Sequence, residues 1–120
     1  MFHCSGGIHR SGTAAAILLS ALGVPWETVR EDYLLSNDYR EEETRHRLSQ
    51  LREKAAETLG VPLEEVDTTN MDAFYVLEAS YIDAALDEIT KEYGSAESYV
   101  REGLGLSDEE IQRLRTELLE

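Results

Sequence analysis

Apolar residues recur at helical spacing along most of the chain, and short junctions separate the recurring segments. The segment from about Ser11 to Leu22 is apolar on nearly all sides, which predicts a helix that is buried over most of its surface. The sequence Leu22-Gly23-Val24-Pro25 ends this segment, because glycine is favoured just after a helix and proline in the first turn of the next one. Residues 59–62 repeat this pattern, and residues 104–107 carry a third version with a serine N-cap. The pattern therefore predicts consecutive helices joined by compact junctions.

Further along, a charged helix is predicted from about Asp38 to Leu59. Its apolar positions fall on one stripe, and charged residues occupy the remaining surface. The stripe consists of Leu48, Leu51, Ala55 and Leu59. We expect this helix to expose most of its surface to solvent.

Two more helices are predicted in the second half of the chain. Residues 68–72, Thr-Thr-Asn-Met-Asp, form a capping cluster before a long helix of about residues 72–92. A short helix follows from Ser95 and ends near Gly103. Ser107-Asp108-Glu109-Glu110 is a capping box that begins the last helix. The apolar residues of that last helix, which we expect to face inward, are Ile111, Leu114, Leu118 and Leu119.

The pattern that marks a half-buried strand is missing from the chain after its first residues. No segment there alternates β-branched and polar residues with a period of two. The length of 120 residues fits one domain, which can bury roughly two thirds of its unfolded surface. We therefore expect a mostly α-helical single domain over residues 1–120, with at most a strand stub before Cys4.

The charge balance excludes several classes of partner. The chain has 25 acidic and 11 basic residues and a formal net charge of −14, which disfavours nucleic acid and anionic membrane surfaces as partners.

No apolar segment reaches the length of a membrane span, and no signal peptide begins the chain. We expect a cytoplasmic protein, with secretion left open because a truncated start would remove a signal peptide. The single cysteine excludes an internal disulfide, and we expect neither a cofactor nor a metal.

The most informative chemistry lies at the start of the chain, in His3-Cys4-Ser5-Gly6-Gly7-Ile8-His9-Arg10-Ser11-Gly12, the Cys4 loop. Its glycines let successive backbone N–H groups face one anion, and the following helix points its positive end at the same place. A thiol in this position ionises below its usual pKa of about 8.5. The Arg10 guanidinium can bind two oxygens of the anion at once, which a lysine cannot do.

These residues predict a phosphate-binding loop with a nucleophile at its base. We assign nucleophilic attack on phosphorus to Cys4 and the binding of phosphoryl oxygens to Arg10. Ser11 is placed to hydrogen-bond the thiolate or to help it leave in a second step. The backbone N–H groups that would bind phosphate, or an anion like vanadate, are those of Ser5, Gly6, Gly7, Ile8, His9 and Arg10.

The Cys4 loop resembles the active-site loop of the cysteine-dependent protein tyrosine phosphatases. The rest of the chain is similar to the bacterial branch of that family, through Ala14 to Pro25, Asp32-Tyr33-Leu34-Leu35-Ser36-Asn37, Tyr93-Gly94-Ser95 and Tyr99 to Ser107. The resemblance implies an enzyme that hydrolyses phosphate monoesters through a phosphocysteine intermediate, with a phosphorylated protein or phosphate ester as substrate.

The resemblance also implies which part of the fold is present. In this family the loop lies near the middle of an α/β fold, after several strands. We therefore expect the helical C-terminal half of that fold, with the active-site loop at residues 3–12 and a helical bundle over residues 13–120. A homodimer is one way in which such a half would cover its exposed face.

One pair of residues departs from the bacterial branch. Its members usually carry Lys-Asp before the loop arginine, with the aspartate as general acid, whereas this chain has Ile8-His9. A histidine can protonate a leaving phenolate near neutral pH. Two interpretations therefore stay open, in which His9 serves as the acid or points to solvent without a catalytic role.

Two other function classes also stay open. The chain could be a binding module that holds phosphate but turns over slowly without the other half of the fold. It could also be another cysteine enzyme with a similar loop, such as an arsenate reductase or a sulfurtransferase. An arsenate reductase usually needs further thiols, and Cys4 is the only cysteine in this sequence.

Overall fold

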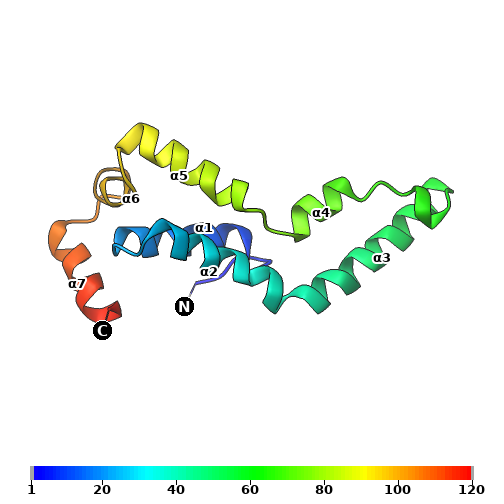
Figure 1. Ribbon diagram of the computed structural model, residues 1–120, viewed down its shortest axis with the longest axis horizontal. Helices are drawn as coiled ribbons and strands as arrows, with labels where there is room; N and C mark the ends of the chain where they lie inside the picture. The colour runs from blue at the N-terminus through cyan, green and yellow to red at the C-terminus, as the bar shows by residue number, and fades with distance from the viewer. Residues whose placement is uncertain (1, 120) are drawn as a thin grey trace. The chain divides into compact units, whose positions relative to one another are not determined.

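The computed structural model describes residues 2–119, and all regular elements in this range are helical (Figure 1). The α-helices are α1 (His9–Ala21), α2 (Trp26–Tyr39), α3 (Glu41–Leu59), α4 (Thr69–Tyr75), α5 (Ala79–Tyr93), α6 (Ala96–Ser98) and α7 (Asp108–Leu118). A 3₁₀ turn covers Leu63–Glu65, and a π-helical turn covers Tyr99–Gly103. No strand occurs between residues 2 and 119, which confirms the mostly α-helical prediction. None of the helices in this range is long and apolar enough to cross a bilayer.

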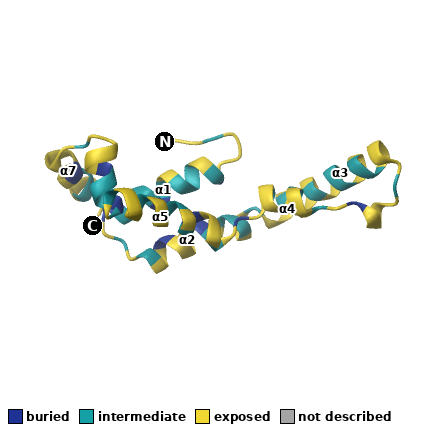
Figure 2. Ribbon diagram, turned by 90° about the horizontal axis from the view of Figure 1, so that it is seen from above, coloured by how far each residue is buried: buried dark blue, intermediate teal, exposed yellow. Residues whose placement is uncertain are grey.

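The chain forms two compact units. The first unit joins the chain up to Tyr33 with the chain from Glu78 onward, and the second is Leu34–Leu77. The core of the first unit contains Ile8, Ala16, Ala21, Leu22, Val29, Tyr33, Ile82, Ala96, Val100 and Ile111 (Figure 2). The first unit also holds the Cys4 loop, so its packing decides how that loop is presented.

Helix α1 is less buried than its composition predicts. Within it, only Ala16 and Ala21 are buried, although the segment is apolar on nearly all sides. A cavity of about 320 Å³ lies against this helix, between it, the π-helical turn and α7. The expectation of burial on most sides is therefore confirmed only in part: most residues of α1 are half-buried, because the cavity leaves the apolar face incompletely covered.

The predicted helix junctions are confirmed. Gly23, Gly60 and Gly105 each have a positive φ, of 92°, 67° and 76°. At the first junction, the Gly23 N–H donates to the carbonyl of Ser20, and the Val24 N–H donates to that of Leu19. Glycine is needed here because a side chain strains a residue in the left-handed region. This geometry ends α1 and lets α2 begin at Trp26.

The last helix begins as predicted but ends differently. The Ser107 hydroxyl accepts from the Glu110 N–H at 3.3 Å, and the Glu110 carboxylate accepts from the Ser107 N–H at 2.8 Å. Ile111 is buried in a cluster with Ala21 and Val100. Leu118 and Leu119 are 54% and 45% exposed, so their predicted inward orientation is wrong. The last turn of α7 lies outside that cluster.

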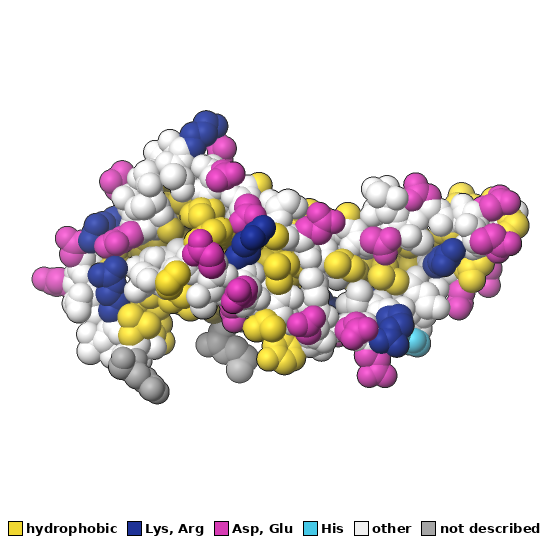
Figure 3. All heavy atoms as spheres, viewed as in Figure 1, with side chains coloured by type: hydrophobic (Ala, Val, Ile, Leu, Met, Phe, Trp, Pro, Cys, Tyr) yellow, Lys and Arg dark blue, Asp and Glu magenta, His cyan; other side chains and the backbone are white. Residues whose placement is uncertain are grey.

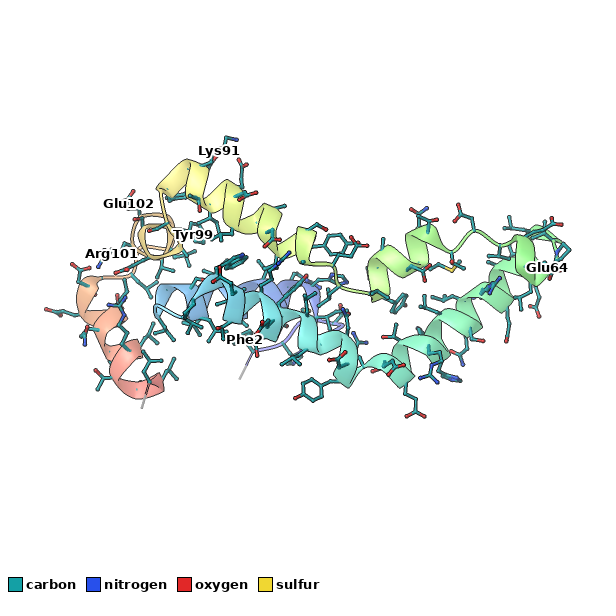
Figure 4. All side chains as sticks on the ribbon, in the orientation of Figure 1. Phe2, Glu64, Lys91, Tyr99, Arg101 and Glu102 are labelled. Carbon is teal, nitrogen blue, oxygen red and sulfur yellow. The ribbon has the colours of Figure 1, made fainter. Side chains whose placement is uncertain are left out.

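Ion pairs join the π-helical turn to its neighbours. Arg101, labelled in Figure 4, pairs with Glu97 at 2.9 Å and with Asp108 at 2.6 Å. Arg115 on α7 donates to the carbonyl of Ala21 at 3.1 Å, at the end of α1. These contacts tie the C-terminal helix to the far end of the helix that carries the Cys4 loop.

Two predicted helices are interrupted. The charged helix expected from Asp38 begins at Glu41, because α2 continues through Tyr39 and Arg40 departs from helical geometry. The helix expected over residues 72–92 is split into α4 and α5 by an extended segment at residues 76–78. The buried Leu77 explains this second break. Its N–H donates to Oδ1 of Asn37 and its carbonyl accepts from Nδ2, both at 2.8 Å.

Replacing Asn37 with alanine is expected to lower the free energy of unfolding by about 2 kcal/mol. The change leaves the N–H and carbonyl of the buried Leu77 without their side-chain partner, and an unmet buried polar group costs about 1–3 kcal/mol. Urea unfolding followed by circular dichroism measures the loss. Asn70→Ala, at an exposed position on α4, is the matched control and should change stability by less than about 0.5 kcal/mol. Equal effects of the two variants would contradict the bridging role of Asn37.

Candidate active site

The Cys4 loop runs from an exposed start into the first turn of α1. Residues 5–8 form a bend, and Gly7 within it has φ +70°. Ile8, the residue before the helix, is only 5% exposed, and its carbonyl accepts from the Gly12 N–H at 2.9 Å. Helix α1 begins at His9, two residues earlier than expected. The buried Ile8 therefore anchors the end of a bend whose other residues face solvent.

Cys4 and Ser11 are brought together across the loop. The Cys4 N–H donates to Oγ of Ser11 at 2.8 Å. Hydrogen bonds from the side chain and then the backbone of Ser11 lower the pKa of the Cys4 thiol from 9.0 to about 6, with smaller help from the N–H groups of Gly7 and Gly6, while burial opposes the shift. Cys4 is therefore mostly a thiolate at neutral pH, as the sequence predicts.

Arg10 lies in the first turn of α1 and reaches back toward the start of the loop. Its Nη2 donates to Oγ of Ser5 at 3.4 Å, and its side chain is exposed. The guanidinium thus lies on the same loop as the thiolate, with N–H groups still available to an anion. Acidic side chains are spread over the face in Figure 3, with basic ones between them. Because the chain also has a net charge of −14, a field that attracts an anion must come from the loop itself.

The other residues of the Cys4 loop lie at or near the protein surface. Ser5, Gly6 and Gly7 are exposed. His9 is half-buried, and its carbonyl accepts from the Thr13 hydroxyl at 3.0 Å. Phe2, labelled in Figure 4, is 58% exposed and directly precedes the loop. Between residues 2 and 119, no group of three histidine, cysteine or acidic side chains is arranged to hold a metal ion.

One contact at this site was not predicted from the sequence. The ring of Tyr33, on α2, lies against Gly12, the residue after Ser11. Tyr33 is 5% exposed, and burial raises the pKa of its hydroxyl, with Tyr81 as the smaller cause. A glycine inside a helix costs about 0.5–1 kcal/mol relative to alanine. The glycine at position 12 was therefore a signal of close packing.

Together these residues carry the chemical groups that binding a tetrahedral oxyanion requires. The N–H groups at the start of α1 and the Arg10 guanidinium supply donors, and anions are favoured at a helix N-terminus. The Cys4 thiolate supplies a nucleophile at the other end of the same loop. The arrangement can hold such an anion and attack its central atom.

Alkylation of Cys4 by iodoacetamide is expected to rise with pH through a midpoint of about 6. The thiolate reacts and the thiol does not, so the rate follows ionisation of Cys4, whose pKa is lowered to about 6. Ser11→Ala removes the largest cause of that lowering, so its midpoint should move up toward about 8.5. Alkylation reactions that are quenched at set times and analysed by mass spectrometry measure the pH profiles of the wild-type protein and of Ser11→Ala. Ser95→Ala, far from the loop in sequence, is the control, and a shift as large as that of Ser11→Ala would contradict the assignment.

Comparison with known proteins agrees with the family resemblance that the sequence shows. A sequence profile described as the Tyrosine phosphatase family matches residues 1–120. The chain is 33% identical over 120 residues to the triple specificity protein phosphatase PtpB of Mycobacterium tuberculosis, covering 98% of this chain and 42% of that protein. It is 29% identical over 118 residues to a tyrosine-protein phosphatase of Nostoc commune, covering 98% of this chain and 38% of that one. The chain thus spans about a third to two fifths of the length of the curated relatives it matches.

Proposed function

The chain belongs to the tyrosine phosphatase family, and from this premise we propose that it hydrolyses phosphate monoesters of tyrosine through a phosphocysteine intermediate. The observation that carries the proposal is the contact of Ser11 with Cys4. The Cys4 N–H donates to Oγ of Ser11 at 2.8 Å, and hydrogen bonds, of which those of Ser11 are the largest, lower the pKa of the thiol to about 6. A thiolate is a far better nucleophile than a thiol. The proposed substrate is a phosphorylated protein or another phosphate ester.

The first proposed step transfers the phosphoryl group to Cys4. The thiolate sulfur attacks phosphorus, the bond between phosphorus and the ester oxygen breaks, and the leaving oxygen takes up a proton. Arg10 and the N–H groups from Ser5 to Arg10 stabilise the negative charge on the other phosphoryl oxygens. The second step is hydrolysis, in which water attacks phosphorus, the bond to sulfur breaks and Cys4 leaves as a thiolate. The proton that water loses passes to the group that protonated the leaving oxygen in the first step. Ser11 favours that departure, because it stabilises the thiolate.

We propose His9 as the proton donor to the leaving group. It adjoins Arg10 in the first turn of α1 and is half-buried, and imidazolium is a suitable acid near neutral pH. The chain has histidine where the bacterial branch usually has aspartate.

Replacing His9 with asparagine should therefore affect substrates unequally. We expect kcat for phenyl phosphate to fall about 10²-fold, because phenolate is a poor leaving group that needs protonation. For p-nitrophenyl phosphate, whose leaving group is stable as an anion, the fall should be less than about tenfold. His46→Asn, at an exposed position on α3, is the control. An equal loss on both substrates would show that His9 is not the acid.

A phosphate-binding module of low activity is the second candidate. The observation that favours it is the exposure of Ser5, Gly6 and Gly7, because water that reaches the loop weakens the electrostatic stabilisation of a transition state. Hydrolysis of p-nitrophenyl phosphate, with vanadate as competitor, separates the two candidates. Turnover that vanadate blocks supports the enzyme. A folded chain that binds vanadate in calorimetry without turnover supports the binding module.

A further inference from the structure

We infer that Tyr33 is a positioning residue for the Cys4 loop. Its ring packs against the first turn of α1, and through that turn it fixes the two residues that hold the loop, Ile8 and Ser11. The inference rests on the proposed function in one respect, namely that Cys4 is the nucleophile whose position matters.

The contact between Tyr33 and Gly12 is unusually close. A Cβ atom added at Gly12 would lie 2.9 Å from Cε2 of Tyr33 and 3.0 Å from Cδ2. Side-chain carbons in protein interiors pack at about 3.5–4.0 Å, so even alanine at this position would displace the ring. The ring has little room to move, because Tyr33 is buried and Val29, one turn earlier on α2, is 1% exposed.

Two hydrogen bonds connect this contact to the loop. The Gly12 N–H donates to the carbonyl of Ile8 at 2.9 Å, which fixes the residue where the bend meets the helix. Ser11, the neighbour of Gly12, accepts from the Cys4 N–H at 2.8 Å. A shift of the first turn would therefore change both the anchor of the bend and the group that stabilises the thiolate.

The bend itself has little packing to replace this support. Ser5, Gly6 and Gly7 are exposed, and a Cβ at Gly7 would meet nothing within 4 Å. The buried residue at the end of the bend is Ile8, whose carbonyl accepts from the N–H of Gly12, the residue that Tyr33 contacts. The position of Cys4 relative to Ser11 thus depends on Tyr33, a buried residue that lies outside the loop.

The test measures Cys4 reactivity, which does not require turnover. Tyr33→Ala should lower the iodoacetamide rate about tenfold at pH 6.5 and move the alkylation midpoint upward from about 6. Tyr33→Phe keeps the ring and should retain the wild-type profile. The ionisable side chains of the loop stretch, His3, His9 and Arg10, are present in every variant. If Tyr33→Ala does not fold, Tyr33→Leu provides the same test with less loss of volume.

A matched variant separates positioning from loss of stability. Ile111→Ala removes an equally buried side chain from the cluster at the other end of α1. It should lower the melting temperature as Tyr33→Ala does, but leave the alkylation midpoint at about 6. A Tyr33→Ala midpoint that stays at the wild-type value in a folded chain, or that moves no further than that of Ile111→Ala, would overturn the inference.

A double-mutant cycle tests the contact directly. Gly12→Ala alone should slow alkylation, because the new methyl group displaces the ring. Since Tyr33→Ala removes that collision, the double variant should be no slower than the slower single variant. If the reductions in alkylation rate caused by the two single substitutions multiply in the double variant, the contact between Gly12 and Tyr33 is contradicted. Two results separate this inference from the proposed function. If the wild-type protein turns over substrate but the alkylation midpoint of Tyr33→Ala does not move, only the positioning role is refuted. If that midpoint moves but the wild-type protein has no turnover, only the proposed function is refuted.

Discussion

Replacing Cys4 with serine is expected to lower kcat/KM for p-nitrophenyl phosphate by at least about 10⁴-fold. The hydroxyl has nearly the same size as the thiol, but an alcohol is a far weaker acid and stays protonated over the pH range of the assay. The hydrogen bonds from Ser11, Gly7 and Gly6 that lower the pKa of the thiol to about 6 cannot bring an alcohol into that range. Initial rates measured between about pH 5 and pH 9, with wild-type and variant proteins from parallel preparations, determine the loss.

The pH dependence of the wild-type protein gives an independent check of this assignment. Because the pKa of Cys4 is lowered, the reactive thiolate is present above about pH 6 and is lost as the pH falls below it. The acid side of the kcat/KM profile should therefore include ionisation near pH 6. Residual turnover in Cys4→Ser with the wild-type profile would identify a different nucleophile or a contaminating phosphatase. Calorimetry with vanadate should show that Cys4→Ser still binds the anion.

Replacing Arg10 with alanine should lower kcat/KM about 10³-fold, the second-largest effect expected. Its guanidinium is permanently charged, and charge-assisted hydrogen bonds to phosphoryl oxygens strengthen as negative charge develops in the transition state. Arg10→Lys should recover less than about tenfold of that loss, because an ammonium group cannot donate two parallel hydrogen bonds. The same assay measures both variants, and vanadate inhibition reports the loss of anion binding.

The control for Arg10 is Arg113→Ala. Arg113 is exposed on α7 and pairs with Glu117 at 2.7 Å, so its removal changes the net charge by the same amount without touching the loop. We expect its kcat/KM to stay within about twofold of wild type, since exposed charges are screened by salt. A large loss of kcat/KM in Arg113→Ala would mean that the net charge of the protein, and not the hydrogen bonds of the Arg10 guanidinium, governs activity. Full activity in Arg10→Lys would contradict the proposed bidentate contact.

Much of the candidate site could be predicted from the sequence, because its parts lie within ten residues. The spacing of Cys4, Ser11 and the two glycines fixes which backbone N–H groups face the thiol, and the helix that follows is marked by its own apolar pattern. The structure brings Cys4 to Ser11 and Arg10 to Ser5, as a short loop requires. The role of His9 depends on the substrate and its leaving group, so the sequence leaves it open.

The sequence by itself determined the elements whose hydrogen bonds are local. The glycine junctions at Gly23 and Gly60 and the capping box at Ser107 depend on residues within a few positions of one another, so backbone geometry alone decides them. The Cys4 loop belongs to the same class, which explains why its chemistry can be inferred without a structure.

The tertiary structure decided the features whose partners are distant along the chain. Asn37 interrupts the helix predicted over residues 72–92 by bonding Leu77, 40 positions away. Tyr33 on α2 contacts Gly12 on α1. The last turn of α7 lies outside the buried cluster that contains Ile111. An apolar pattern identifies the face of a helix that is expected to be buried, but it does not identify the side chains that pack against that face. That choice depends on how the helices pack, and it determines what holds the Cys4 loop in place.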